Sequence, residues 1–418
     1  MPELNGKALA ILALVALTAC QLAPVSAGNS PDQDFAEIER GRYLTAAADC
    51  AACHTNPDGG RPFAGGRPIE TPFGTVLAAN ITPDRETGIG NWTEQQFIAA
   101  VREGKRSDGK RLYPAMPYVY YTKMRQSDVQ AIHAYLNTLP PVHQPIETNQ
   151  LPFPFDIRAG MRLWDALYLN ATPRKTDPSR SQAWNRGAYL VQGAGHCAAC
   201  HTPKGILGGD LGKHSLQGYS LQGWFAPNIT NDQSRGLGGW SPEDLVEYLK
   251  TGHNRFAGAS GPMSEEVLHS SSQMTDADLA AIAAYLKDVP GQAAGNKPLS
   301  ADDPRMRAGR AIYQDLCAAC HRQDGTGVAQ LIPNLAAASS IASREPTSLL
   351  RVVIRGAQSV ATQSEPTGPA MPAFGWQLTD AQIAAVTTYL RNNWGHAAAP
   401  VGARDVHTAR RALQARSD

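Results

Sequence analysis

Three copies of one five-residue motif contain six of the seven cysteines in this chain of 418 residues. Each copy reads Cys-Ala-Ala-Cys-His. Two thiols at this spacing can each form a thioether with a vinyl group of haem, and the adjoining histidine then binds the iron from the proximal side. The motifs therefore predict three covalently bound haem c groups. The cysteines are Cys50, Cys53, Cys197, Cys200, Cys317 and Cys320, and the proximal histidines are His54, His201 and His321.

A single copy of this motif has two other interpretations. It could be half of a zinc site, or a redox-active pair of cysteines that precedes a histidine by chance. A zinc site would need a second pair of ligands in each block, and the sequence provides no such pair. Three identical copies, each at the start of a similar block, favour haem attachment.

Each haem iron also needs a distal ligand, unless its sixth position stays open. Methionine is a common distal ligand, and its thioether raises the reduction potential. Met116 and Met263 each lie 62 residues after the histidine of their own motif, and Met371 lies 50 residues after His321. All three adjoin a proline, whose fixed φ helps to hold a sulfur at one point. We predict that Met116, Met263 and Met371 are the distal ligands.

Two other methionines compete for this role. Met124 and Met274 each lie close to the predicted start of a helix that closes a block. That position is more typical of a methionine in the core or on the surface than of an iron ligand. Met161 and Met306 lie outside the haem blocks.

The motifs are positioned by helices in the same order in each block. The helices that precede the motifs are predicted at 34–49, 181–191 and 304–316, and those that close the blocks begin near Ser127, Thr275 and Thr379. Thr275 and Thr379 resemble N-caps, because an acidic or amide residue follows in the first turn. A glycine in each first helix (Gly41, Gly187 or Gly309) leaves room for an aromatic residue of the closing helix to pack across it.

The first and second blocks are copies of each other. The first cysteines of their motifs are 147 residues apart, and Asn80-Ile81-Thr82 returns as Asn228-Ile229-Thr230 at an offset of 148. A repeat of this length indicates duplicated domains, because the units of solenoid proteins are much shorter. The third block is shorter and more divergent.

The N-terminus has the features of an export signal. Lys7 precedes an apolar run from Ala8 to Ala19, which is too short to span a bilayer and suits a signal peptide. Cleavage after Ala27 would release a soluble protein. Alternatively, Leu17-Thr18-Ala19-Cys20 resembles a lipoprotein box, which would make Cys20 the lipidated first residue. We favour lipidation, because it accounts for the seventh cysteine.

Charge and composition argue against other classes of function. The formal net charge is +1, which indicates neither a nucleic-acid partner nor a strongly acidic surface. The sequence contains no Gly-rich dinucleotide fingerprint and no nucleophile–base arrangement. In a haem protein of this kind the cofactor carries out the redox step, while the protein sets its potential and spacing. We therefore expect electron transfer and not substrate chemistry.

Short stretches around the motifs carry a family resemblance. They are Asn80-Ile81-Thr82-Pro83, segment 112–118 (Leu-Tyr-Pro-Ala-Met-Pro-Tyr), segment 258–263 (Gly-Ala-Ser-Gly-Pro-Met) and Met371-Pro372-Ala373-Phe374. The chain resembles the trihaem cytochrome c subunit of bacterial membrane-bound dehydrogenases from about Glu37 to Pro400. Members of that family serve alcohol, gluconate, sorbitol or fructose dehydrogenases, and similar modules serve molybdenum hydroxylases. The family's haem-binding cysteines, proximal histidines and distal methionines carry over to the residues named above.

The resemblance implies partners and a location. Electrons would come from a catalytic dehydrogenase subunit, which is a quinoprotein, a flavoprotein or a molybdenum hydroxylase. They would leave toward ubiquinone or a terminal oxidase, at the membrane surface on the periplasmic side of the inner membrane. Two alternatives stay open, a free-standing multihaem electron shuttle and a haem enzyme with one open iron site. A methionine candidate for every haem argues against the haem enzyme.

The predicted fold is mainly α, with three tandem class I cytochrome c domains. The domains cover 32–146, 181–291 and 303–397, and the remainder is a signal peptide at 1–27 (or a lipoprotein signal ending at 19), linkers at 147–180 and 292–302, and a polar tail at 398–418. A helix within 157–169 is expected to pack between the first two domains; the alternative is a docking surface for the dehydrogenase or the membrane. The basic tail offers no apolar membrane anchor.

Overall fold

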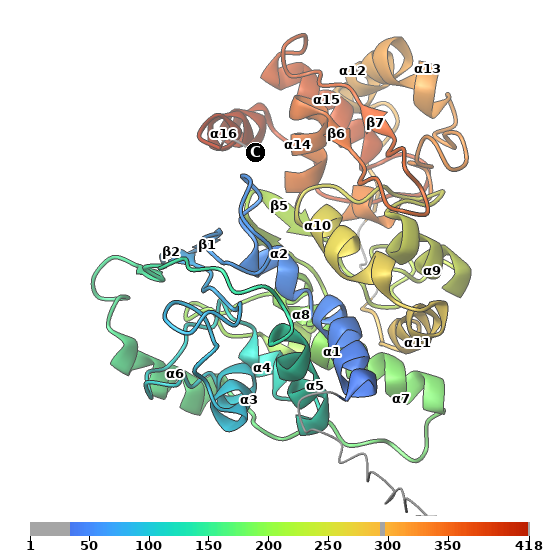
Figure 1. The fold of residues 1–418 in the computed structure, drawn as a ribbon. Coiled ribbons are helices and arrows are strands. Elements are labelled where there is room, and N and C mark those ends of the chain that lie inside the picture. The colour runs from blue at the N-terminus through green and yellow to red at the C-terminus, as the bar shows by residue number, and fades with distance from the viewer. Residues whose placement is uncertain (1–33, 293–296, 417–418) are drawn as a thin grey trace, which may run out of the picture.

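The computed structural model describes residues 34–292 and 297–416 of the chain. The predicted signal peptide, Cys20 included, and part of the predicted linker 292–302 lie outside the described residues. Helices dominate the described part, as expected, and they form three units (Figure 1). The first two units, coloured blue to yellow, lie in the lower and middle part of the figure, and the third, in orange and red, lies above them.

The first two units contain a similar series of elements. The first consists of α1 (Phe35–Ala47), α2 (Cys50–His54), β1 (Pro68–Thr71), β2 (Gly74–Leu77), α3 (Glu94–Glu103), α4 (Tyr118–Tyr121) and α5 (Gln126–Leu136). The second consists of α7 (Gln182–Tyr189), the π-helix η2 (Leu190–Ala194), α8 (Ala198–His201), the 3₁₀ helix η3 (Gly212–His214), β4 (Tyr219–Leu221), β5 (Trp224–Ala226), α9 (Pro242–Thr251), α10 (Pro262–His269), the 3₁₀ helix η4 (Ser271–Gln273) and α11 (Asp276–Leu286). In both units an antiparallel hairpin follows the motif.

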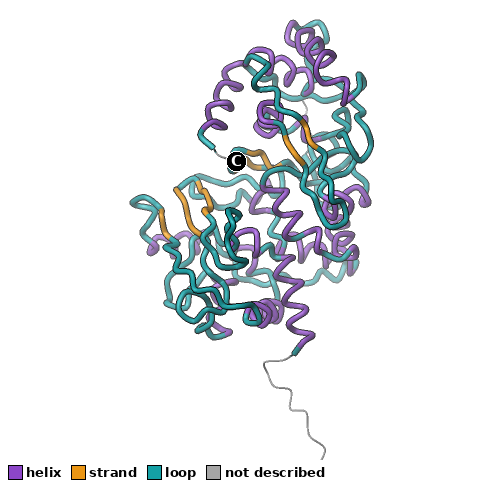
Figure 2. The backbone as a smooth tube through the Cα atoms, turned by 45° about the horizontal axis from the view of Figure 1, so that its top comes forward, coloured by secondary structure: helices purple, strands orange, loops and turns teal. Residues whose placement is uncertain are grey.

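The third unit and the linker between the first two complete the fold. The third unit consists of α12 (Pro304–Ile312), the π-helix η5 (Tyr313–Cys317), α13 (Ala318–His321), the 3₁₀ helix η6 (Ser339–Ala342), α14 (Thr347–Arg355), β6 (Ala357–Gln358), β7 (Ala370–Met371), α15 (Asp380–Leu390) and α16 (Ala403–Gln414). The linker contains β3 (Asn149–Gln150), the 3₁₀ helix η1 (Arg158–Gly160) and α6 (Met161–Tyr168). Figure 2 shows that the described strands form only small separate sheets.

The first and last helices of each unit cross at the predicted glycine. A Cβ atom at Gly41 or at Gly187 would lie 1.8 Å from a backbone carbonyl oxygen of the closing helix, and one at Gly309 would lie 2.2 Å from such an oxygen. The same three Cβ atoms would lie 2.5–2.9 Å from the Cβ of an aromatic residue. These aromatic residues are Tyr135, Tyr285 and Tyr389. The predicted glycine–aromatic crossing is thus confirmed in all three units.

Gly187→Ala is expected to destabilise the second unit by about 1–3 kcal/mol. The new methyl group would clash with the Ala281 carbonyl, a backbone group that cannot rotate away. That cost exceeds the gain of about 1 kcal/mol in helix propensity. Denaturant unfolding of the haem-loaded protein would measure the change. Gly239→Ala is the matched control, because a Cβ there meets nothing within 4 Å; equal stability of the two variants would contradict the crossing.

The closing helices begin where the capping residues allow. The Thr275 hydroxyl accepts a hydrogen bond from the Asp278 amide at 3.3 Å, and Thr379 forms a capping box with Gln382. Both predicted N-caps are confirmed. The first closing helix, α5, begins at Gln126, one residue before the expected Ser127, and its N-cap Arg125 makes no side-chain capping bond.

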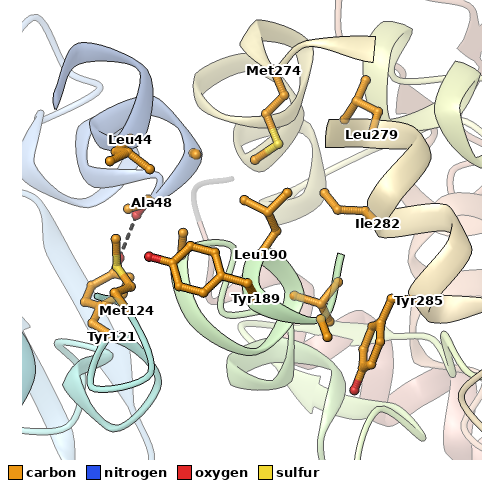
Figure 3. Close-up of a cluster of buried hydrophobic side chains, with 14 of the residues drawn as sticks. Leu44, Ala48, Tyr121, Met124, Tyr189, Leu190, Met274, Leu279, Ile282 and Tyr285 are labelled. Atoms are coloured by element: carbon orange, nitrogen blue, oxygen red, sulfur yellow. Dashed lines mark hydrogen bonds between the residues drawn. The ribbon is translucent and has the colours of Figure 1, made fainter. Parts of the chain in front are cut away.

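One hydrophobic core joins the first two units. Residues of both belong to a single buried cluster, whereas the two other clusters lie in the third unit. Figure 3 shows Leu44, Ala48 and Met124 of the first unit facing Tyr189 and Leu190 of the second. The first two units therefore pack against each other through shared apolar surface, and they are not independent domains joined by a flexible linker.

A reciprocal pair of polar contacts crosses the same interface. Near the start of α5 and of α11, a buried aspartate accepts hydrogen bonds from an arginine of its own unit and a tyrosine of the other unit. The two sets are Asp128 with Arg40 and Tyr189, and Asp278 with Arg186 and Tyr43. The third unit has Ala308, Ala311 and Gln382 at the matching positions, so it cannot form this set.

Helix α6 of the linker packs between the first two units, as expected. The Trp164 indole donates a hydrogen bond to the Leu207 carbonyl of the second unit at 2.8 Å. Asp165 accepts one from the Tyr118 hydroxyl of the first unit at 2.7 Å. On the outer face of α6, Leu163 is 69% exposed and Leu167 is 59% exposed.

The segment expected as a polar tail forms the amphipathic helix α16. Its Val406 and Leu413 are buried in the core of the third unit. Arg410 binds the carboxylate of Asp380 at 2.7 Å, and Arg416 reaches Glu70 of the first unit at 2.6 Å. The basic residues thus fasten this helix to the rest of the protein.

Candidate functional site

Each motif occupies about one helical turn. Its cysteines and histidine lie in α2 in the first unit, and in or just before α8 and α13 in the other two. Positions i, i+3 and i+4 of a helix share one face. The two thiols and the imidazole of each motif are therefore on the same side of the turn, as attachment to one flat haem requires.

All three motif histidines are oriented through the same ring position, Nδ1. In each, Nδ1 lies within hydrogen-bond distance of a backbone carbonyl oxygen. The pairs are His54 with Ala79 at 2.7 Å, His201 with Pro227 at 2.6 Å, and His321 with Pro333 at 3.3 Å. A carbonyl can only accept, so Nδ1 carries the proton and the lone pair of Nε2 stays available for a metal. Burial lowers the pKa of all three imidazoles, which also keeps Nε2 unprotonated.

The carbonyls that orient these histidines lie outside the attachment motifs. Each carbonyl belongs to the residue before an asparagine, namely Asn80, Asn228 or Asn334. The Asn80 side chain accepts hydrogen bonds from the amide and hydroxyl of Thr82 at 2.9 and 2.8 Å, and Asn228 holds Thr230 in the same way. In the first two units the repeated Asn-Ile-Thr sequence marks the turn that presents the carbonyl, whereas in the third unit Asn334 is followed by Leu335 and Ala336.

The second and third candidate sites open into one cavity of about 670 Å³. Its lining includes both cysteines and the histidine of each of these two motifs, together with Met263 and Met371. Asp49, Ala52 and Cys53 of the first unit also line it. The structure therefore brings two predicted haem sites into one space and places the first motif at its edge. The lining does not include His54 or Met116.

The chemistry of this cavity suits haem. Most of its lining is apolar, from side chains such as Leu245, Ile282 and Phe374. Three lining side chains, Trp224, Trp240 and His253, have buried ring nitrogens without a hydrogen-bond partner. A ligand with a large apolar body and a few acceptors at its edge would match this lining, and haem has that form, with two carboxylates at one edge of the ring.

The neighbourhood of the motifs lacks the ligands of a zinc site. A structural zinc ion is bound by four side chains. Among the residues that the structure describes, no group of three or more histidine, cysteine, aspartate or glutamate side chains is placed to hold a metal ion. The zinc interpretation is therefore disfavoured.

The predicted distal methionines have different local structures. Met116 lies in a bend before α4, as expected of a proline loop, whereas Met263 lies in the first turn of α10 and Met371 lies in the short strand β7. The competing Met124 is fully buried in the shared core. Met274 is also a core residue, but it lines the cavity together with Met263, so the structure leaves two candidates for the second site.

The distal segments of the second and third units contact each other. The Val360 amide donates a hydrogen bond to the Ala259 carbonyl at 3.3 Å, and the Ser260 hydroxyl donates one to the Gln358 carbonyl at 3.4 Å. Ala259 and Ser260 precede Met263, whereas Gln358 and Val360 precede Met371. The two sites therefore adjoin through the segments that carry their predicted distal ligands.

A charged cluster joins the first motif to the second unit. Arg67 donates a hydrogen bond to the Ala52 carbonyl of the motif and binds Glu265 of α10 at 2.6 Å. Burial, and then repulsion by Glu266 and Glu265, raises the pKa of Asp49 well above its usual range. Burial also raises the pKa of Glu266 to about 7, although a hydrogen bond from Ser271 opposes the shift. The junction between the first two sites thus contains carboxyl groups that resist ionisation.

Comparisons with known proteins agree with this arrangement. The cytochrome c family matches residues 38–140, 185–290 and 306–394, one segment for each unit. This confirms the predicted fold class, three cytochrome c domains in series. Within the described ranges, no helix has both the length and the apolar character needed to cross a membrane.

Three characterised relatives resemble nearly the whole chain. The gluconate 2-dehydrogenase cytochrome c subunit of Pantoea cypripedii is 39% identical over 90% of this chain and 89% of its own length. The fructose dehydrogenase cytochrome subunit of Gluconobacter japonicus is 40% identical, over 89% and 82%. The cytochrome c subunit of the quinone-type alcohol dehydrogenase of Gluconobacter oxydans is 36% identical, over 92% and 84%.

Proposed function

This chain belongs to the cytochrome c family, among the cytochrome c subunits of bacterial dehydrogenases, and from that premise we propose that it carries electrons on three covalently bound haem c groups. It is an electron-transfer subunit, and substrate is oxidised elsewhere. A free-standing shuttle and a haem enzyme with an open iron site are not favoured, because the relatives are named as subunits of dehydrogenases.

Each unit would hold its haem through the residues of its own block. The cysteine pairs Cys50 and Cys53, Cys197 and Cys200, and Cys317 and Cys320 would form the thioethers. His54, His201 and His321 would bind iron through Nε2, and Met116, Met263 and Met371 would bind it from the distal side. Haem iron supplies the one-electron chemistry, while the apolar lining excludes water and helps to set the potential.

The orientation of the motif histidines carries this proposal. In all three units, Nδ1 lies within hydrogen-bond distance of a backbone carbonyl oxygen. In each motif histidine, Nε2 is therefore the nitrogen that is available to bind iron. Intact mass after acid–acetone extraction, which removes haem that is not covalently bound, is expected to show three haem additions. Two or fewer, in protein matured with a complete haem-loading system, would contradict the proposal.

The electron donor would be a catalytic dehydrogenase subunit. The relatives are named as cytochrome subunits of gluconate, fructose and alcohol dehydrogenases, and the donor would be a quinoprotein, a flavoprotein or a molybdenum hydroxylase. The acceptor would be ubiquinone or a terminal oxidase at the periplasmic side of the inner membrane. Copurification of a large catalytic subunit that reduces these haems in the presence of its substrate would test the partnership.

Replacement of Cys20 tests how the protein is held at the membrane. If Leu17 to Cys20 is a lipoprotein box, Cys20→Ser is expected to move the protein from the membrane fraction to the soluble fraction, because several lipid chains anchor a protein far more firmly than one. Mass spectrometry of the native N-terminus is the direct measurement. A mature chain that begins at Gly28 would exclude lipidation.

A further inference from the structure

Lys204 makes three hydrogen bonds beside the second attachment motif. This lysine lies three residues after His201, and its side chain is only 13% exposed. Its ammonium group donates one hydrogen bond to the Ala198 carbonyl of the motif at 2.9 Å and another to the Tyr120 hydroxyl of the first unit at 3.1 Å. The third goes to the carboxylate of Asp210, with which the lysine forms an ion pair. An ammonium group has three donors, so every one of them is used.

The same contacts reach the distal side of the first site. Tyr120 lies in α4, four residues after the predicted distal ligand Met116. Its hydroxyl donates to the carboxylate of Asp210, whose two oxygens lie 2.8 and 2.9 Å away. Burial, and then the charge of Asp210, raises the pKa of Tyr120, so the hydroxyl keeps its proton. Tyr120, Lys204 and Asp210, which we call the lysine cluster, therefore join the motif of the second unit to the distal segment of the first.

We propose that the ion pair of Lys204 and Asp210 sets the reduction potential of the second haem. The proposal rests on the attachment of that haem to Cys197 and Cys200. Ferric haem carries one more positive charge than ferrous haem, so a nearby cation favours the ferrous state and a nearby anion favours the ferric state. Lys204 contacts the motif directly, and its side chain is largely shielded from water and salt, which would otherwise weaken its field. Tyr120 is a positioning residue that holds the two charged groups in place.

The other two units have no lysine at this position. The third residue after the motif histidine is Lys204 in the second unit, Pro57 in the first and Asp324 in the third. Asp324 is exposed, and it accepts hydrogen bonds from Thr326 of the same turn. In the first unit a carbonyl of the motif is bonded instead by Arg67, which belongs to a later segment. The lysine cluster is therefore specific to the second of the three sites.

Redox titration of the full haem-loaded protein tests the proposal through the sign of the shift. Lys204→Met removes the cation and keeps a side chain of similar length, so it is expected to lower one of the three midpoint potentials. Asp210→Asn removes the anion and keeps the shape, so it is expected to raise the same potential. Lys204→Arg keeps the charge and should preserve that potential. Lys213→Met, the matched control, removes an exposed lysine of the same unit and should leave all three potentials unchanged.

The possible outcomes separate a role of charge from a role in structure. A loosened haem site would move the potential in the same direction in Lys204→Met and Asp210→Asn, so shifts of equal sign would overturn the proposal. Three unchanged potentials in Lys204→Met with three haems attached would also overturn it and leave the proposed function intact. The potential that moves should be the one that is missing when Cys197 and Cys200 are replaced by alanine, and movement of another one would contradict the assignment. Fewer than three haems in the original protein would refute the proposed function itself. If Lys204→Met does not fold, Asp210→Asn decides the question by the same measurement.

Discussion

Replacing Cys197 and Cys200 together by alanine is expected to remove one of three haems and to stop electron passage through the protein. The second unit shares its core with the first and its cavity with the third, so its haem would lie between the other two. Intact mass should show two haem additions, and the haem absorbance should fall by one third. Reduction of the protein by its partner dehydrogenase should no longer be followed by reduction of the acceptor.

The same variant is expected to be less stable than the original protein. A ligand that binds only the folded state stabilises it, and here its loss would leave part of an apolar cavity of about 670 Å³ unfilled. Cys200→Ala alone is the matched control, because Cys197 can still form one thioether. That variant should keep three haems, with the pyridine haemochrome band moved toward the red by the remaining vinyl group. Three haem additions in the double variant would refute attachment at this motif.

Replacing each predicted distal methionine by leucine is expected to lower one midpoint potential and to remove about one third of the weak red absorption band. Axial ligands tune haem potentials over a range of about 0.8 V, so the shift in midpoint potential caused by the loss of a thioether ligand should be easy to measure. The variants are Met116→Leu, Met263→Leu and Met371→Leu. In each, the two other haems should be little changed, because their ligands belong to other units.

The buried methionines of the core provide the controls. Met124→Leu and Met274→Leu are volume-conserving changes that usually cost less than about 1.5 kcal/mol, and they should leave all three potentials nearly unmoved. The comparison matters most for the second unit, where Met263 and Met274 both line the cavity. If Met274→Leu removes the band while Met263→Leu does not, the ligand of the second haem is Met274. The shared spacing of 62 residues would then be a result of duplication alone.

Several features could be predicted because they depend on residues close together in the sequence. The attachment motif needs two thiols and an imidazole within one helical turn, so its spacing alone indicates covalent haem. The first helices were expected at 34–49, 181–191 and 304–316, and α1, α7 and α12 lie inside these ranges. The glycine of each first helix also identified the crossing, because only a residue without a side chain lets two backbones approach so closely.

Other local features could not be predicted from the sequence. The helices before the second and third motifs pass into the π-helices η2 and η5, and an α-helical periodicity does not distinguish these turns. The hairpins contain strands of two to four residues, which is too short for alternation to be recognised. The basic residues of segment 398–418 predict a polar tail, but some of its apolar side chains are buried. Two of them, Val406 and Leu413, lie on the face of α16 that packs against the third unit.

Tertiary structure decided which groups meet across long separations. The carbonyls that orient the motif histidines lie 25, 26 and 12 residues away in the sequence. The reciprocal contacts of Tyr189 with Asp128 and of Tyr43 with Asp278 join residues 61 and 235 positions apart. The sequence by itself determined the chemistry of this protein, because thioether attachment and helix crossing are set by neighbouring residues. Only the folded chain decided how the sites are joined, because burial of shared apolar surface and pairing of buried polar groups depend on all three units at once.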